Sequence, residues 1–278
     1  MNMSAKELSN TDFDRLSKFI YTNYGIKMPP AKKIMLQARL QTRLRANNMG
    51  SFKEYCDYVL SNKSDTSEIV HMIDVVSTNK TDFFRESAHF NFLEDIVLPE
   101  FYEKNAGDTI RIWSAASSSG EEIYTIAMVV NEFIEKNKKM NFSILGTDIS
   151  SRILEKAAKA IYHIDRLAPV TLNLKRKYLL RNKNKEIKDV RIVPELRKKT
   201  SFQRLNLMDT SYPVPKNFDV IFCRNVLIYF DRETQEKVIN KLCMHLKPGG
   251  YFFLGHSESI TGIEVPLKQL QPTVFKRI

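Results

Sequence analysis

Hydrophobic residues recur at helical spacing through the first quarter of the chain. Phe13, Leu16, Ile20 and Tyr24 form the first such set. Further helices are predicted at residues 31–46, 52–60 and 66–76. Thr11 with Asp14, and Ser51 with Glu54, have the spacing of capping boxes at two helix starts. The pattern therefore predicts a small helical domain over residues 1–80.

Beyond residue 80 the pattern changes to short apolar runs that alternate with amphipathic helical stretches. A long helix from Ser87 to Lys104, within a linker over residues 81–108, leads into the first run. Strands are predicted at residues 110–113, 141–148, 220–223, 251–255 and 273–276. Continuous apolar runs are typical of strands buried on both faces of a parallel sheet. We therefore expect a doubly wound α/β domain over residues 109–278.

Residues 175–204 interrupt this alternation with a polar, lysine-rich stretch. Within it, residues 187–193 and 200–205 have the composition of short antiparallel strands. We therefore expect a small antiparallel β-subdomain, inserted into the α/β domain at about residues 178–204.

The turn after the first predicted strand is built from small residues. It reads SAASSSG from Ser114 to Gly120, and Glu121 and Glu122 open the following helix. Small residues at the carboxyl end of a parallel strand let a ligand approach the backbone closely. The turn lacks the glycine patterns that cradle phosphate, and its two glutamates would repel an anion. It favours a ligand with a cationic group, although some folds of this class bind nothing here.

Asp148 ends the second predicted strand, and Ser150 is placed to cap the helix that follows. A carboxylate at this position can accept hydrogen bonds from both hydroxyls of a ribose. A lone aspartate is more often a capping or surface residue. Because the small-residue turn precedes it in the expected order, the combination favours a nucleoside ligand.

Polar residues follow the strand at residues 220–223 directly, at the edge where α/β sheets place their sites. They are Arg224, Asn225 and Tyr229. Four blocks now stand in order along the chain: STNKTDFFRE from Ser77, SAASSSGEEIYTIA from Ser114, FDVIFCRNVLIYFD from Phe218 and FFLGHSES from Phe252. Together they resemble the CheR-type chemotaxis receptor methyltransferases, and the resemblance covers nearly the whole chain.

The resemblance implies an enzyme that uses S-adenosylmethionine to methylate glutamate side chains of chemotaxis receptors, with S-adenosylhomocysteine as the other product. It implies a small all-α N-terminal domain followed by a Rossmann-like class I methyltransferase domain with a small antiparallel β-subdomain inserted. In some members that subdomain docks a peptide from the C-terminal tail of the receptor.

The resemblance also assigns roles to individual residues. Those expected to bind the cofactor are Asn79, Thr81, Arg85, Glu122, Asp148, Asn206, Leu207, Arg224 and Asn225. Among them, Glu122 is expected to pair with the methionine ammonium, and Asn206 and Leu207 to lie against the adenine. Family loops often have a glycine where this chain has Ala116 and a proline where it has Ile123, but alanine still permits close approach.

Arg85 and Tyr229 are the candidates for catalysis, as donors that hold the substrate carboxylate. Each has a plainer alternative. Arg85 could form only an interdomain salt bridge. Tyr229 lies among apolar neighbours and could be only a core aromatic residue.

The charge of the chain points to an acidic partner. The formal net charge is +11, from 43 basic and 32 acidic residues. Residues 31–50 contain no acid, and Lys32, Arg39 and Arg43 are spaced to share one helix face. Such a face is often simply solvated, but the resemblance makes it a candidate surface for binding the glutamate-rich helical bundle of a receptor.

Other features exclude several classes of protein. The three cysteines are widely spaced and the five histidines do not cluster along the sequence, so neither disulfides nor a metal site is expected. Without a signal-peptide core or a membrane-spanning run, we expect a cytoplasmic monomer that does not insert into membranes.

Two rival functions share the same fold. A nucleic-acid methyltransferase would also explain the basic charge, but such enzymes typically carry an Asn/Asp-Pro-Pro-Tyr run where this chain has Arg224-Asn225-Val226-Leu227. We therefore expect no nucleic-acid substrate. A binding module without catalytic activity is the second rival, and the intact cofactor residues argue against it.

Overall fold

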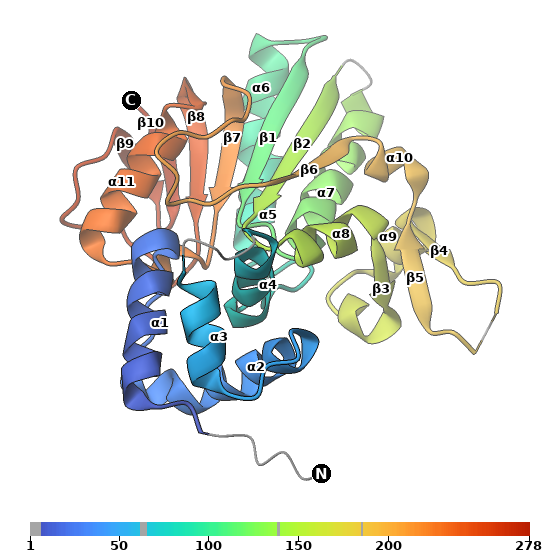
Figure 1. The fold of residues 1–278 in the computed structure, drawn as a ribbon. Coiled ribbons are helices and arrows are strands. Elements are labelled where there is room, and N and C mark those ends of the chain that lie inside the picture. Colours follow the sequence, from blue (N-terminus) through green and yellow to red (C-terminus); the bar gives the residue numbers. More distant parts are fainter. Residues whose placement is uncertain (1–6, 62–65, 138–139, 185) are drawn as a thin grey trace.

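The computed structural model describes residues 7–61, 66–137, 140–184 and 186–278. These residues form a helical lobe, a large sheet flanked by helices and a small peripheral sheet (Figure 1). The helical lobe consists of α1 (Asn10–Tyr24), η1 (Pro30–Lys32), α2 (Lys33–Ala46), α3 (Phe52–Val59) and α4 (Thr66–Val76). The helical pattern is confirmed, and the apolar sides of these helices share one core. Residues 1–6 and 62–65 of the predicted helical domain lie outside the described residues.

One of the two predicted capping boxes is wrong. The N-cap of α1 is Ser9, whose Oγ accepts a hydrogen bond from the backbone N–H of Asp12 at 3.0 Å. Thr11 therefore lies inside the helix. Ser51 does cap α3, because its Oγ accepts from the N–H of Glu54 at 3.2 Å.

The predicted long helix is a continuous helical run in three parts. These are α5 (Ala88–Phe92), the π-helical turn η2 (Leu93–Val97) and α6 (Leu98–Lys104). Pro99 has no N–H to continue the regular ladder, so the wider turn lies just before it. The run packs its apolar side against the large sheet through Phe90, Leu93 and Val97.

The large sheet has the strand order β6-β2-β1-β7-β8-β10-β9. At its centre, β1 (Thr109–Ala115) pairs in parallel with both β2 (Asn141–Asp148) and β7 (Phe218–Cys223). β8 (Leu246–Leu254) continues the parallel part. β10 (Val274–Arg277) runs antiparallel to β8 and to the edge strand β9 (Leu267–Gln271), which the hydrophobic pattern did not predict. The chain order reverses between β1 and β7, which is where open α/β sheets bind ligands.

Both faces of the sheet are buried, as the apolar runs predicted. In β7, Val220 and Phe222 pack into the core shared with α7 (Glu121–Asn137), while Ile221 and Cys223 pack into the core shared with α11 (Arg232–Cys243). Such alternation requires apolar side chains at every position of a central strand.

The small sheet differs from the prediction in its membership. It has the order β3-β5-β4, built from β3 (Ile161–His163), β5 (Asp189–Ile192) and β4 (Leu179–Arg181). The segment at residues 200–205, predicted to pair within this subdomain, instead forms β6 (Thr200–Arg204) and pairs in parallel with β2. β6 therefore extends the large sheet, and the small sheet also recruits residues that precede the predicted insertion.

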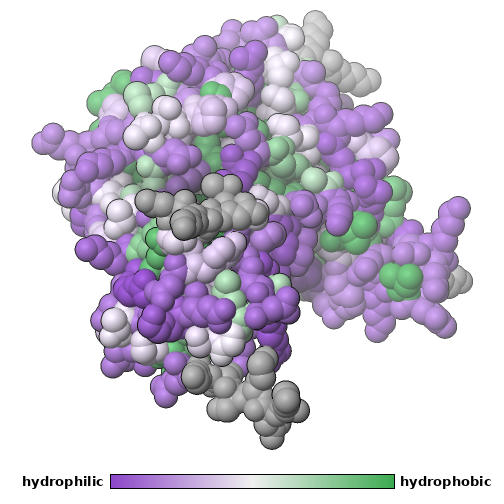
Figure 2. Space-filling view, in the orientation of Figure 1, coloured by the Kyte–Doolittle hydropathy of each residue, from purple (hydrophilic) through white to green (hydrophobic). Residues whose placement is uncertain are grey.

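Three short helices accompany the small sheet: η3 (Ile164–Leu167), α9 (Leu172–Tyr178) and α10 (Pro194–Arg197). α8 (Ser151–Lys159) precedes it, and Ser150 caps α8 as predicted by accepting from the N–H of Ile153 at 3.3 Å. The visible face of the molecule is mostly hydrophilic, with separate small apolar patches (Figure 2). None of the helices in the described part of the chain is long and apolar enough to cross a membrane.

The helical lobe lies against the carboxyl edge of the sheet through the loop after α1. Gly25 ends α1 with a φ of +68°, and a Cβ there would lie 2.3 Å from Cε1 of Phe230. Only glycine allows this turn and this approach. The Asn206 side chain adds an interdomain hydrogen bond, donating from Nδ2 to the carbonyl of Asn23 at 2.8 Å.

Candidate active site

The turn between β1 and α7 is held in a strained conformation. Ala116 and Ser118 have φ angles of 63° and 51°, in the left-handed region that non-glycine residues rarely adopt. Strain of this kind costs about 1–3 kcal/mol per residue and is concentrated at functional sites. The backbone N–H of Ser118 donates to Oδ2 of Asp148 at 2.9 Å, so the turn and the end of β2 form one unit.

Asp148 lies buried at the end of β2, as predicted. Its Oδ1 accepts from the N–H of Ser150 at 3.0 Å. Burial raises the pKa of this carboxyl, although the backbone hydrogen bonds oppose the shift. Each carboxylate oxygen has two lone pairs and accepts one of these N–H groups. The remaining acceptor capacity suits the two hydroxyls of a ribose.

Glu122, in the first turn of α7, is fixed on both oxygens. Oε1 accepts from the Ser114 hydroxyl at 2.7 Å, and Oε2 accepts from Nη1 of Arg224 at 2.8 Å. Arg224 directly follows β7 and its side chain is only 1% exposed. The sequence therefore placed both residues at the site without showing that they pair with each other.

Glu86 and Glu258, which the sequence analysis missed, hold residues of the site in place. Glu86 accepts from Nη2 of Arg224 at 2.9 Å and from Nδ2 of Asn225 at 3.0 Å. Burial alone would raise the pKa of Glu86, but the hydrogen bonds from Asn225 and Arg224 outweigh this effect, so the net result is a lowered pKa. Both glutamates lie within the quoted sequence blocks, which is the signal that could have identified them.

Glu258 fixes the backbone around Asn225. It accepts from the N–H groups of Asn225 at 2.9 Å, Leu227 at 2.7 Å and Gly255 at 2.6 Å. Asn225 has a φ of 59°, so a strained residue is again held by a buried carboxylate. Burial raises the pKa of Glu258 despite these hydrogen bonds.

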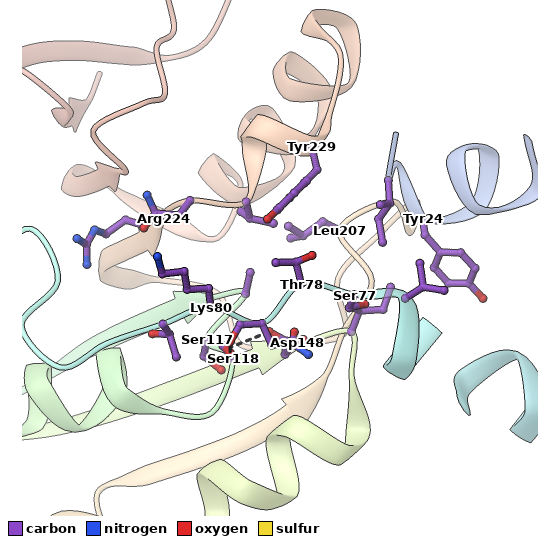
Figure 3. Close-up of a pocket in the computed structure, with 18 of the residues that line it drawn as sticks. Tyr24, Ser77, Thr78, Lys80, Ser117, Ser118, Asp148, Leu207, Arg224 and Tyr229 are labelled. Atoms are coloured by element: carbon purple, nitrogen blue, oxygen red, sulfur yellow. Dashed lines mark hydrogen bonds between the residues drawn. The ribbon is translucent and has the colours of Figure 1, made fainter. Parts of the chain in front are cut away.

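One cavity collects nearly all of the predicted site residues. It lies between the helical lobe and the carboxyl edge of the sheet, with Asp148 between Arg224 on one side and Tyr24 on the other (Figure 3). The predicted residues that line it are Lys32, Asn79, Thr81, Arg85, Glu122, Asp148, Asn206, Leu207, Arg224, Asn225 and Tyr229. Of the predicted set, Arg39 and Arg43 do not line it.

The two catalytic candidates line this cavity from segments that are far apart in the sequence. Arg85 is half-buried, and its Nη1 donates to the carbonyl of Lys80 at 3.1 Å. Tyr229 belongs to η4 (Leu227–Tyr229) and projects into the cavity (Figure 3). Nζ of Lys32 lies 5.8 Å from the centre of the Tyr229 ring. Tyr229 is therefore not a fully buried core residue.

The basic face of α2 is largely engaged inside the protein. Arg43 donates from Nε and Nη2 to Glu68 of α4, at 3.0 and 2.5 Å, and Glu68 is buried. Nη1 of Arg39 donates to the carbonyls of Val76 and Ser77 at 2.5 and 3.2 Å. The acid-free sequence of α2 suggested free cations, but a neighbouring helix supplies the acid. Lys32 is the member of this set that faces the cavity.

Two histidines that are far apart in sequence meet beside Glu86. One carboxylate oxygen of Glu86 and one ring nitrogen each of His89 and His256, atoms that could bind a metal ion, lie within 4.8 Å of one another. His89 is buried beside Thr273, and burial lowers its pKa to about 4. Oε2 of Glu86 already accepts from Arg224 and from the backbone N–H of His256 at 3.1 Å. Arg224 is thus the cationic partner of this carboxylate.

The cavity suits S-adenosylmethionine at three points. Glu122 offers a carboxylate for an ammonium group, and Asp148 offers acceptors for ribose hydroxyls. Leu207 and Phe230 provide apolar surface next to the loop after α1. Ala116 also lines the cavity, and its methyl side chain leaves room for a ligand to approach the backbone.

Comparison with known proteins agrees with this fit. The all-alpha domain of CheR methyltransferases matches residues 11–77, and their SAM binding domain matches residues 79–275. A chemotaxis protein methyltransferase from Borreliella burgdorferi is 41% identical over 100% of this chain and 96% of its own length. One from Escherichia coli is 36% identical, covering 92% of this chain and 87% of its own length.

A third relative, chemotaxis protein methyltransferase 2 from Pseudomonas aeruginosa, is 33% identical over 95% of this chain and 92% of its own length. The matches span both the helical lobe and the α/β domain with its cavity. S-adenosylmethionine is therefore the cofactor, and the chain belongs to the CheR methyltransferase family.

Proposed function

We propose that this protein transfers the methyl group of S-adenosylmethionine to glutamate side chains of chemotaxis receptors, forming glutamate methyl esters. The observation that carries the proposal is the position of Arg85 and Tyr229, which line the same cavity as Glu122 and Asp148. A carboxylate substrate held by these donors would lie next to the cofactor. The relatives named chemotaxis protein methyltransferase support a receptor as the substrate.

The reaction needs little acid–base chemistry from the protein. When bound, S-adenosylmethionine supplies a methyl group on a positively charged sulfur. A glutamate side chain has an ordinary pKa of about 4.3, so it is already ionised at neutral pH. No residue has to remove a proton from it. The protein's task is to orient the carboxylate, which can supply up to ~7–11 kcal/mol of the barrier reduction.

Two donors are positioned to orient the substrate. The Arg85 guanidinium carries a permanent positive charge and a planar fork of N–H groups that matches a carboxylate. The Tyr229 hydroxyl projects into the cavity and can donate one further hydrogen bond (Figure 3). Because the helical lobe covers the cavity with Tyr24, Ile26 and Met35, water is partly excluded and these contacts are strengthened.

Lys32 extends the positive charge from the cavity toward the helical lobe. Its ammonium lies near Tyr229, and its own helical segment has no acidic residue. A glutamate-rich helix from a receptor would therefore meet a positive entrance. This complementarity favours an acidic protein helix as the substrate.

The test combines methylation with the chemistry of the product. The protein is incubated with cofactor labelled in the methyl group and with the cytoplasmic domains of receptors from the same genome. We expect label on receptor that alkali releases as methanol, because esters hydrolyse in base and N-methyl groups do not. Mass spectrometry then locates the modified glutamates, and receptors with glutamine at those positions serve as controls. Alkali-stable label, or label transferred only to added RNA, would contradict the proposal.

A further inference from the structure

The subdomain around the small sheet, residues 161–197, supports the cofactor turn in two ways: Tyr162 contacts the turn directly, and Arg166 contacts Glu121 just after it. The turn from Ser114 to Gly120 includes the left-handed residues Ala116 and Ser118. A non-glycine backbone remains in that conformation only where surrounding contacts hold it. Asp148 supplies one such contact, to the N–H of Ser118. The Ser118 hydroxyl also donates to the carbonyl of Asn79 at 3.0 Å, and the N–H of Ser117 donates to the carbonyl of Thr147 at 2.8 Å. Further support comes from β3 and η3, elements of the subdomain that do not line the cavity.

Tyr162 of β3 provides the first contact. Its hydroxyl donates to the carbonyl of Ser119 at 2.8 Å, and its ring is buried edge-on against Phe83 at 5.0 Å between centroids. Burial raises the pKa of Tyr162, so the hydroxyl keeps its proton and remains a donor. Gly120 has a φ of +93°, and a Cβ there would lie 2.9 Å from the Tyr162 hydroxyl oxygen. The tyrosine and the end of the turn therefore fit closely.

Arg166 of η3 provides the second contact, and it joins two segments that face the cofactor. Its Nη2 donates to Oε1 of Glu121 at 2.8 Å and to the carbonyl of Thr81 at 2.5 Å. Glu121 is buried, and its other oxygen accepts from the Ser119 hydroxyl at 2.6 Å. Without Arg166, one oxygen of a buried carboxylate would lose its cationic partner.

We propose that Tyr162 and Arg166 form a clamp by which the inserted subdomain holds the cofactor turn and the segment around Thr81 in their binding conformation. Both are positioning residues, since neither lines the cavity. The subdomain is then required for cofactor affinity, independently of any part it plays in receptor docking. This inference rests on the cofactor assignment of the turn, and it makes no use of the receptor.

The test measures cofactor binding without receptor. Tyr162→Phe removes the hydroxyl and keeps the ring, and we expect it to weaken S-adenosylhomocysteine binding about threefold to tenfold in titration calorimetry. Arg166→Gln should weaken binding about tenfold or more. Arg166→Lys keeps the charge but has a single donor centre for Glu121 and Thr81, so its affinity should lie between Arg166→Gln and the wild type.

A second readout follows the turn itself. Hydrogen exchange of the amides at residues 116–121 in cofactor-free protein should be faster in Tyr162→Phe and Arg166→Gln than in the wild type. Matched controls come from the same subdomain. Tyr178→Phe removes a buried tyrosine hydroxyl that bonds Glu132, and Arg191→Gln removes an arginine that donates to the Lys159 carbonyl. Neither control residue contacts the turn, so both should bind cofactor within twofold of the wild type.

The outcomes separate the clamp from a general loosening of the subdomain. Wild-type affinity and wild-type exchange in Tyr162→Phe and Arg166→Gln would overturn the proposal. Equal losses of affinity in the controls, at equal loss of Tm, would also overturn it. A wild-type protein that binds no cofactor would refute the cofactor assignment instead, and the exchange measurement would still decide whether the clamp holds the turn.

Discussion

Nη1 of Arg224 lies 2.8 Å from Oε2 of Glu122, so a buried cation orients the carboxylate that faces the cofactor cavity. The Ser114 hydroxyl fixes the other oxygen. Each of these oxygens keeps a second lone pair, so Glu122 can accept from an ammonium without breaking either bond. The arrangement presents a carboxylate in one orientation before any ligand binds, which lowers the entropy cost of binding.

We expect Glu122→Gln to weaken binding of S-adenosylmethionine about tenfold or more, because the ammonium loses a charge-assisted hydrogen bond. Titration calorimetry checks the change. Glu132→Gln is the matched control on the same helix, where the glutamate pairs with Lys177 and Tyr178 outside the cavity. Equal affinities for Glu122→Gln and Glu132→Gln would remove Glu122 from the cofactor site.

The sequence predicted those parts of the site that can be recognised from a short stretch of residues. β7 is a continuous apolar run from Val220 to Cys223, and β1 and β2 carry shorter apolar stretches among polar residues. Asp148 ends β2, and Arg224 directly follows β7. β9 escaped prediction because it is an edge strand whose side chains are mostly exposed, so it carries no apolar period. β6 was recognised as a strand, but its partner was not, because pairing depends on segments far away in sequence.

Ion pairs between residues far apart in the sequence could not be predicted either. Nothing in the sequence of α2 shows that Arg43 pairs with Glu68, and nothing near Glu122 shows that Arg224 pairs with it. The clamp residue Arg166 lies 45 positions from Glu121. Such pairs follow from the packing of elements, and a single sequence gives only the elements themselves. The site could therefore be located from its motifs, but the ion pairs and hydrogen bonds among its residues could be identified only from the structure.

Asp148→Ala should weaken cofactor binding at least tenfold, since the variant loses the acceptors for the ribose hydroxyls and leaves the N–H of Ser118 without its carboxylate. Calorimetric titration measures the loss. Asp219→Ala is a suitable control because Asp219 also accepts from a backbone N–H, that of Arg111 at 2.8 Å. Asp219 lies near the amino end of β7, away from the carboxyl edge of the sheet where the cavity lies. An affinity for Asp148→Ala that matches Asp219→Ala would contradict the assignment.

Tyr229→Phe and Arg85→Ala should lower turnover on receptor by more than they lower stability. Both residues line the cavity and are proposed to donate to the substrate carboxylate, so each variant removes one donor to it. We expect about tenfold or more in kcat for each, with Tm close to the wild type. Tyr58→Phe and Arg45→Ala, outside the cavity, control for loss of a hydroxyl and of a positive charge. Wild-type turnover in both cavity variants would disprove the catalytic roles.

Arg43 should act mainly on stability. Arg43→Gln leaves Glu68, whose side chain is 5% exposed, without its cation, and this should destabilise the helical lobe by about 2–4 kcal/mol. Burial alone would raise the pKa of Glu68, but hydrogen bonds from Arg43, Asn47 and Tyr55 outweigh this effect, so the net result is a lowered pKa. The pair therefore stabilises the protein above the ordinary carboxyl pKa of about 4.5, and this contribution is lost as pH falls.

Thermal unfolding of Arg43→Gln and the wild type at several pH values checks this expectation. The difference in Tm should be largest near neutral pH and should shrink below pH of about 4.5. A difference that is absent at pH 7 would show that Arg43 is not a structural partner, and would return it to the group of residues available to the receptor.

Lys32 should act on receptor binding instead. Its ammonium lies at the cavity beside Tyr229, and charge reversal there would repel an incoming acidic helix. We expect Lys32→Glu to raise the receptor KM about threefold to tenfold at low salt, an effect that added salt should reduce because the Debye length at physiological ionic strength is only about 8 Å.

Lys33→Glu is the matched control. Lys33 is adjacent in sequence but donates to Asn10 at 2.7 Å and does not line the cavity. Because Lys32 lines the cavity, cofactor affinity is measured in parallel for both variants, and a change in receptor KM larger than the change in cofactor affinity separates docking from cofactor binding. If Lys32→Glu and Lys33→Glu give the same receptor KM at low salt, the positive entrance is a solvated surface and the receptor must be recognised elsewhere.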